Sequence, residues 1–79
     1  MSSISNRLQG IIKEVLADNN LRYDEQLVES TKLRSDLGFD SLQLAELTVR
    51  LEDEFDVDVF ESGIVETVGE VQAKLAHSE

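Results

Sequence analysis

The stretch SDLGFDSL, residues 35–42, decides the fold, because a long helical pattern begins directly after it. Asp40 lies where a helix N-cap is expected, since its carboxylate is able to accept hydrogen bonds from the free amides of the first turn. Gln43 completes the spacing of a capping box, and Gly38 provides a flexible turn just upstream. Ser41 therefore takes the first helical position with its hydroxyl facing solvent. The unpaired amides and the positive end of the helix dipole favour an anion there, so a phosphodiester on Ser41 would be well placed.

The apolar side chains that follow predict a helix over about residues 41–55. At about 100° per residue they form one narrow core face: Leu44, Leu47, Thr48, Leu51 and Phe55. Leu42 and Val49 point almost opposite, with Ala45 beside them, and are expected in water. Isolated exposed aliphatic side chains are common and need no function. Yet these share a face with Glu46 and Asp53, and apolar contacts surrounded by acid are typical of a docking surface for a partner with an apolar, basic patch.

The composition restricts both size and partners. The 79 residues are expected to form a single domain, 1–79, with one modest core and no deep catalytic cavity. No cysteine is present, which excludes disulfides and thiolate metal sites. With 7 Lys and Arg against 17 Asp and Glu, the net charge of −10 excludes ordinary electrostatic binding to nucleic acid or anionic lipid and points to basic partners. No apolar run approaches the roughly 20 residues of a membrane span and no signal pattern is present, so a cytoplasmic location is expected.

A first helix is predicted from Ser5, as its cap, to about Asp18, because its apolar residues recur at the spacing of one buried face. Asn19-Asn20 then ends it, since Asn tolerates the left-handed conformation of a helix C-terminus. Periodicity is poor over residues 21–39, where scattered apolar anchors indicate a long ordered loop with a helical turn around residues 30–33.

The C-terminal third predicts one very short helix and one regular helix. Residues 62–65 are expected to form a turn or a very short third helix, and the capping-box spacing from Thr67 to Glu70 opens a last helix that frays near His77. The whole is expected to be all-α: a small four-helix bundle with a very short third helix and a long ordered loop between helices 1 and 2.

Catalysis by the chain itself is not indicated. A nucleophilic serine needs an adjacent base and a group that orients it, and the single histidine, His77, has no spacing relation to Ser41. The motif G-x-S-x-G and any Gly-rich phosphate loop are absent. The acidic run at residues 56–61 lacks the spacing of a calcium loop. We therefore expect neither an enzyme nor a metal site.

The motif DLGFDSL resembles the attachment site of acyl carrier proteins and peptidyl carrier domains, whose D-S-L serine bears a 4′-phosphopantetheine arm. Residues 40–55, DSLQLAELTVRLEDEF, align without a gap on the family pattern D-S-L-x-x-x-E-L-x-x-x-L-E-x-x-F, and Thr67-Val68 matches the start of its last helix. Two features depart from the pattern. The segment before Thr67 is shorter than usual, with Val59-Phe60 in place of Ile-Pro, and Arg50 adds a positive charge to a face that many fatty-acid carriers keep acidic or neutral.

The resemblance implies a discrete, monomeric carrier whose Ser41 receives 4′-phosphopantetheine from coenzyme A, with Asp40 and Leu42 beside the attachment point. The thiol of the arm would hold acyl or aminoacyl groups as thioesters for a pathway of the fatty-acid, polyketide or nonribosomal-peptide type. The implied partners are a phosphopantetheinyl transferase, a loading enzyme and downstream enzymes with basic docking patches. They would dock on Leu42, Ala45, Glu46, Val49, Glu52 and Asp53. The alternative is an acidic helical interaction module without a prosthetic group, and loading of Ser41 distinguishes the two.

Overall fold

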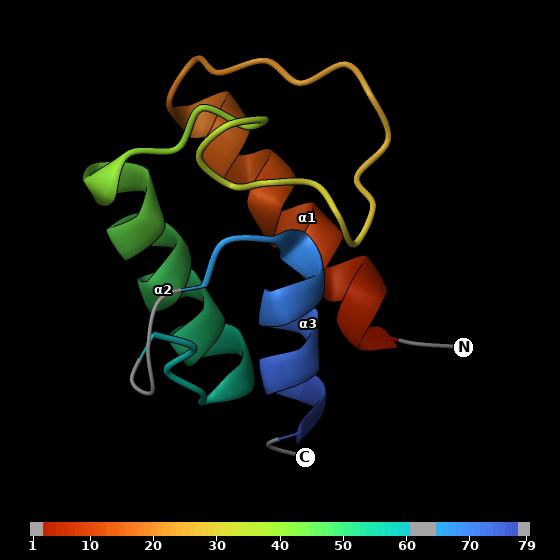
Figure 1. The fold of residues 1–79 in the computed structure, drawn as a ribbon. Helices are drawn as coiled ribbons and strands as arrows, with labels where there is room; N and C mark the ends of the chain where they lie inside the picture. Colours follow the sequence, from red (N-terminus) through yellow and green to blue (C-terminus); the bar gives the residue numbers. More distant parts are fainter. Residues whose placement is uncertain (1–2, 61–64, 78–79) are drawn as a thin grey trace.

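Three helices packed around one core make up the computed structural model, which describes residues 3–60 and 65–77 (Figure 1). They are α1 (Ser3–Asp18), α2 (Ser41–Phe55) and α3 (Val68–His77). These described residues contain no strand, only an isolated antiparallel bridge between Lys32 and Thr67, so the predicted all-α class is confirmed. The very short third helix predicted at 62–65 falls on residues 61–64, which lie outside the described part, and on Val65, which is buried but not helical.

The start of α1 differs from the prediction. The helix begins at Ser3, and Ser5, the predicted cap, lies inside its first turn, so that prediction is wrong. Ile4 explains the difference, because its side chain is only 8% exposed and adds one more position to the buried stripe of the helix. Since α1 packs against both other helices, burial of this extra position favours an earlier start.

The end of α1 agrees with the prediction from the Asn19-Asn20 pair. Asn20 adopts the left-handed conformation with a φ of 56°. The amides of Asn20 and Leu21 donate to the carbonyl oxygens of Ala17 and Leu16 at 3.2 and 2.8 Å, respectively. These two bonds form a Schellman motif and pair carbonyl groups that the end of the helix leaves free.

The loop between α1 and α2 crosses one end of the helices and is held by its own apolar anchors, as predicted (Figure 1). Its buried apolar side chains are Leu27, Leu33, Leu37 and Phe39. The helical turn predicted around residues 30–33 is replaced by two turns: a short one at 29–30, where the Thr31 amide donates to the Val28 carbonyl at 3.0 Å, and a longer one at 33–37. There the Asp36 carboxylate accepts from the Lys32 amide at 2.8 Å and the Asp36 amide donates to the Lys32 carbonyl at 3.0 Å. Gly38 then reverses the chain with a φ of 77°, a conformation that glycine adopts without strain.

Backbone hydrogen bonds join the long loop to the start of α3, a contact that the sequence did not predict. The amide-to-carbonyl pairs are Leu33 to Glu66 at 2.8 Å, Val68 to Thr31 at 2.9 Å and Gly69 to Glu29 at 2.9 Å. The approach is so close that a Cβ on Gly69 would lie 2.9 Å from both Cβ and the carbonyl oxygen of Glu29. Glycine is therefore required at this position by space.

Packing of α2 on α1 largely follows the predicted core face. Leu47 and Leu51 are fully buried, whereas the other three members of the stripe, Leu44, Thr48 and Phe55, are only half-buried. At the C-terminal end of α2, the Arg7 guanidinium lies 4.5 Å from the centroid of the Phe55 ring and pairs with the Glu54 carboxylate.

The predicted capping box of α3 is confirmed. The Glu70 amide donates to Thr67 Oγ1 at 3.2 Å, and Glu70 Oε1 accepts from the Thr67 amide at 3.1 Å. The helix that follows buries Val68, Val71 and Leu75 in the common core.

Candidate functional site

Ser41 is the first residue of α2, and its side chain is exposed. Asp40 caps the helix: its Oδ1 accepts from the amides of Leu42 at 2.9 Å and Gln43 at 3.5 Å. Gln43 Oε1 in turn accepts from the Asp40 amide at 3.0 Å. The capping box predicted from the sequence is therefore confirmed, and it fixes the backbone on both sides of Ser41.

The surroundings of Ser41 fit a phosphodiester on its hydroxyl. Asp40 occupies the Leu42 and Gln43 amides, which therefore are not available to an anion. Neither the amide nor the hydroxyl of Ser41 takes part in a hydrogen bond with the described residues. Attachment at the hydroxyl would break no internal contact, and the unpaired amide and the positive end of the helix dipole favour an anion at this end of the helix.

The predicted outward face of α2 is exposed. Leu42 and Val49 are 67% and 66% exposed, and Ala45 is exposed between them. In the described part of the chain, the large apolar residues exposed to solvent are Leu42, Val49 and Val28. The exposure predicted from helical periodicity is thus confirmed, and the role of this face in docking stays a prediction.

Acidic residues continue this face toward the C-terminal end of α2. Val49, Glu52, Asp53 and Asp56 line a shallow hollow of about 490 Å³. Asp56, which the sequence analysis did not assign to the site, reaches it because the residue adopts a φ of 59° directly after the helix. Periodicity does not predict a left-handed Asp. Asp tolerates this conformation, however, so its place directly after the predicted helix is a signal that could have indicated it.

Glu46 differs from the other predicted docking residues, because its carboxylate is engaged within the molecule. Its side chain is 29% exposed, and its Oε1 accepts from Asn19 Nδ2 at 3.3 Å. Arg50 lies 3.2 Å from its Oε2 and also pairs with Asp18 and, at 3.6 Å, with Glu14. The positive charge of Arg50, expected on the docking face, is therefore balanced by carboxylates between α1 and α2.

An apolar hollow of about 460 Å³ lies along α2, beside its N-terminal half. It is lined by Arg34, Leu44, Ala45, Thr48, Phe60, Val65 and Glu66. Leu44 and Thr48 were assigned to the core, but they are only half-buried because part of each side chain lines this hollow. The sequence analysis missed this hollow, since Phe60 and Val65 lie in a segment without helical periodicity.

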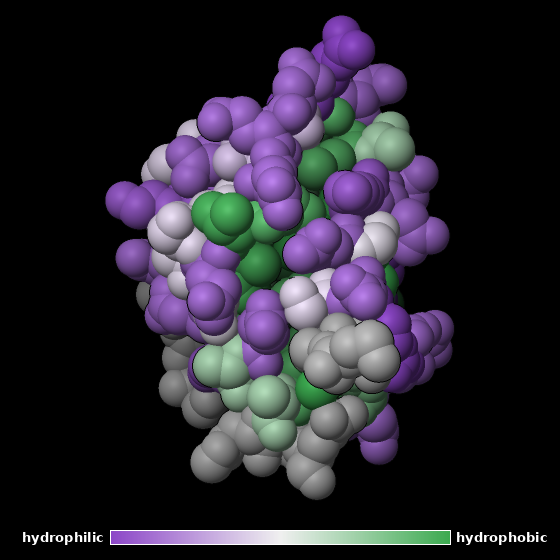
Figure 2. Space-filling view, turned by 90° about the vertical axis from the view of Figure 1, so that its right-hand side faces the viewer, coloured by the Kyte–Doolittle hydropathy of each residue, from purple (hydrophilic) through white to green (hydrophobic). Residues whose placement is uncertain are grey.

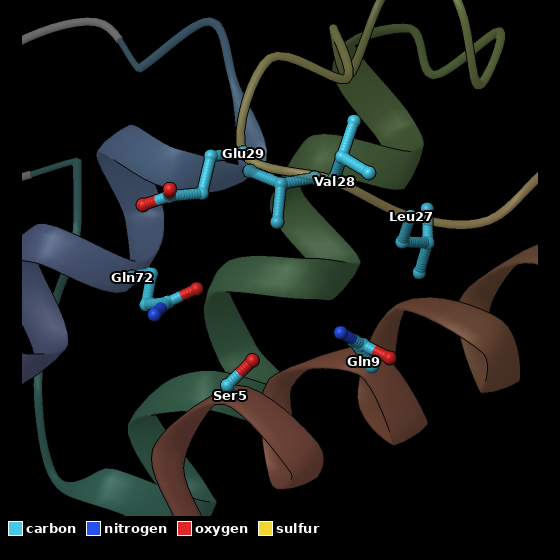
Figure 3. Close-up of a pocket in the computed structure, with 7 residues that line it drawn as sticks. Ser5, Gln9, Leu27, Val28, Glu29 and Gln72 are labelled. Carbon is cyan, nitrogen blue, oxygen red and sulfur yellow. The ribbon is translucent and has the colours of Figure 1, made fainter. Parts of the chain in front are cut away.

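A separate hollow of about 330 Å³ lies among α1, the loop and α3, away from Ser41. Figure 2 shows an apolar strip between hydrophilic side chains on this face. In Figure 3, Ser5 and Gln9 come from α1, Gln72 comes from α3, and Val28 and Glu29 come from the loop. None of these residues belongs to the predicted site.

Neither metal binding nor a membrane span finds support in the described residues. Within residues 3–60 and 65–77, no group of three or more His, Asp or Glu side chains is placed to hold a metal ion. No described helix is both long and apolar enough to cross a membrane.

Comparisons with known proteins agree with this geometry. Residues 6–72 match the family described as the phosphopantetheine attachment site. An acyl carrier protein of Saccharopolyspora erythraea is 47% identical over 62 residues, which cover 76% of this chain and 65% of that protein. An acyl carrier protein of Rickettsia bellii is 41% identical over 59 residues, or 75% of this chain and 67% of the relative.

The fold has a solved counterpart. A structure from Mycobacterium tuberculosis, provisionally assigned as an acyl carrier protein, is similar with a TM-score of 0.77 and 30% identity, covering 98% of this chain and 100% of the other. Sequence and fold thus lead to the same group of proteins. The chain belongs to the phosphopantetheine-attachment family, which includes the acyl carrier proteins.

Proposed function

We propose that Ser41 carries 4′-phosphopantetheine and that the chain transports acyl groups as thioesters on this arm. The observation that carries the proposal is the state of Ser41: exposed, without an internal hydrogen bond, and fixed by a capping box on both sides. The alternative, an acidic interaction module without a prosthetic group, gives no reason for an unengaged serine at this position.

The attachment step needs only an accessible nucleophile from this chain. Ser41 Oγ forms a bond to the phosphorus that bears the pantetheine in coenzyme A, the P–O bond to the second phosphate of the pyrophosphate breaks, and adenosine 3′,5′-bisphosphate leaves. The serine proton passes to a base of the transferase, because His77, the only histidine of the chain, has no spacing relation to Ser41. The arm then supplies the thiol that forms the thioester. The chain is thus a carrier and not an enzyme.

We propose acyl rather than aminoacyl groups as the cargo. The hollow lined by Leu44, Thr48, Phe60 and Val65 lies along the helix that begins with Ser41, and an apolar chain is the ligand that such a lining favours. The relatives named above are acyl carrier proteins, which agrees with this assignment. The proposal covers pathways of the fatty-acid and polyketide type; a cargo found to be aminoacyl would indicate a nonribosomal-peptide type instead.

The proposed docking surface consists of Leu42, Ala45 and Val49 with the acids Glu52 and Asp53. Exposed apolar side chains next to unpaired carboxylates suit enzymes with an apolar contact and a basic rim. The proposed partners are a phosphopantetheinyl transferase, a loading enzyme and downstream enzymes, which meet the monomeric carrier in the cytoplasm, where coenzyme A is available.

The proposal is tested by incubating the apo protein with coenzyme A and a broad-specificity phosphopantetheinyl transferase, then measuring intact mass and mapping the adduct. We expect one arm, on Ser41, and none on Ser41→Ala, whose helicity should be unchanged because the side chain makes no internal contact. Ser35→Ala is the matched control and should load normally. A protein that takes up no arm supports the interaction module, and an adduct on another serine contradicts the site.

A further inference from the structure

The first turn of α2 has only a weak apolar anchor of its own. Among residues 41–45, Leu44 packs against the core but is only half-buried, and the first fully buried residue of the helix is Leu47. The capping box holds the turn in helical form, but it joins Asp40 only to residues of the same turn. A polar contact to α1 would therefore add to Leu44 in setting where this turn lies.

Asn19, at the end of α1, provides that contact. Its Oδ1 accepts from Gln43 Nε2 at 3.0 Å, and its Nδ2 donates to Glu46 Oε1 at 3.3 Å. The same Nδ2 donates to the Val15 carbonyl at 2.8 Å, and the Asn19 amide donates to that carbonyl at 3.2 Å. Asn19 is thus held by the last turn of α1 while both halves of its side-chain amide bind α2.

The side chain of Gln43 has two separate roles, one for each end of its amide. Its oxygen closes the capping box by accepting from the Asp40 amide, and its nitrogen donates to Asn19. A glutamate at this position would keep the first bond, since glutamate also completes a capping box. It would lose the second, because a carboxylate has no N–H to donate. An Asn19 amide that turned over to meet it would lose its bonds to Val15 and Glu46.

We propose that Asn19 is a positioning residue that acts through Gln43 to hold Ser41 and Leu42 in place for the transferase. The inference rests on the proposed attachment at Ser41. Without this tie only the half-buried Leu44 holds the first turn against the core, so the turn gains mobility and the enzyme must order it on binding. Such an ordering cost reduces affinity, so it is expected in the KM for the carrier rather than in kcat.

The test measures loading kinetics of Gln43→Glu, which keeps the capping box and breaks the tie, against Gln9→Glu. Gln9 is also a half-buried helical glutamine, but it lies on the far hollow of Figure 3, so the control adds the same charge elsewhere. We expect KM for Gln43→Glu to rise about two- to tenfold, the range that one hydrogen bond provides, with kcat little changed. Gln9→Glu should load like the wild type. Equal KM values for the two variants would overturn the inference.

Two further measurements separate positioning from a general loss of stability. Val71→Ala, a core truncation in α3, should lower the melting temperature without raising KM, because Val71 is buried in another helix and takes no part in the bonds between Asn19 and Gln43. Amide hydrogen exchange of residues 42–46 should speed up in Gln43→Glu relative to residues 51–55. An equal rise in KM for Val71→Ala, or unchanged exchange in Gln43→Glu, contradicts positioning.

A double-mutant cycle with Asn19→Ala tests whether Asn19 acts through Gln43. If Asn19 acts through Gln43, the double variant Asn19→Ala/Gln43→Glu should raise KM by clearly less than the product of the two single effects. Multiplicative effects would show that the residues act separately and would refute the proposal. A wild-type chain that is not loaded overturns the proposed function instead, and the exchange measurement then still reports whether the tie holds the turn.

Discussion

At the scale of single residues, Gly69 is the described glycine with the least room for a side chain. Adding a Cβ there brings it to 2.9 Å from the backbone oxygen of Glu29, closer than Cβ atoms normally come to another atom. We expect Gly69→Ala to lower the free energy of unfolding by about 1–3 kcal/mol, since overpacking forces the backbone to shift. Urea denaturation of the variant and the wild type measures this difference in the free energy of unfolding.

Gly10 offers the matched control, because a Cβ there meets nothing within 4 Å and the residue lies inside α1. Gly10→Ala should raise the free energy of unfolding by about 0.5–1 kcal/mol, the usual gain of alanine over glycine in a helix interior. If Gly69→Ala proves as stable as Gly10→Ala, the close approach of the loop to α3 is wrong.

The residues that could be predicted from the sequence are those whose partners are close along the chain. Asp40 and Gln43 are three residues apart, so their reciprocal bonds follow from spacing alone. Asn19 lies 24 residues from Gln43, and Arg7 lies 47 residues from Glu54. Such pairs depend on how the helices pack, which no local pattern encodes, and this is why the engagement of Glu46 and Arg50 was not foreseen.

At the scale of elements, α2 separates into a buried face that stabilises the fold and an exposed face that we propose for docking. Leu51 is fully buried, so Leu51→Ala should lower the free energy of unfolding by about 2–5 kcal/mol. Val49 is 66% exposed, so Val49→Ala should change it by no more than about 0.5 kcal/mol and should instead slow loading by the transferase. Thermal melting measures the effect of each variant on stability, and loading kinetics measure its effect on the reaction with the transferase. A Val49→Ala domain that melts early, or an unaffected Leu51→Ala domain, would mean that the helix is phased wrongly.

Helical periodicity predicted the elements better than it predicted their limits. The buried stripes of all three described helices follow from spacing, because burial of one face is what stabilises a short helix. The start of α1 was misplaced because Ile4 gains burial only from tertiary packing. The longer turn in the loop was placed too early because Asp36 fixes it through its side chain, and several polar residues nearby could have made a similar bond.

At the scale of the whole molecule, negative charge greatly exceeds positive charge. The net charge is −10, and two of the seven basic residues, Arg7 and Arg50, are already paired with carboxylates. Long-range attraction should therefore accelerate encounter with basic enzymes, and salt should screen it over about 10 Å at 0.1 M. We expect kcat/KM for loading to fall by about tenfold between low salt and about 0.3 M.

The slope of that salt dependence locates the charges involved. The double variant Glu52→Gln/Asp53→Asn removes two carboxylates from the acidic hollow on α2 and should respond less steeply to salt than the wild type. Glu25→Gln, in the long loop, removes one carboxylate elsewhere and should retain most of the slope. A flat response of the wild type would rule out electrostatic steering.

The hydrogen bonds between the long loop and the start of α3 also bear on the order in which the chain folds during synthesis. The carbonyl groups of Glu29 and Thr31 and the amide of Leu33 are paired only by residues 66–69. A ribosome releases the loop well before it releases those residues, so the nascent loop has unpaired backbone groups next to its apolar anchors. Because α3 also completes the core around α1, the native fold forms only after α3 has emerged. Ser41, the proposed attachment residue, is therefore synthesised before residues 66–69 but acquires its final setting only after them.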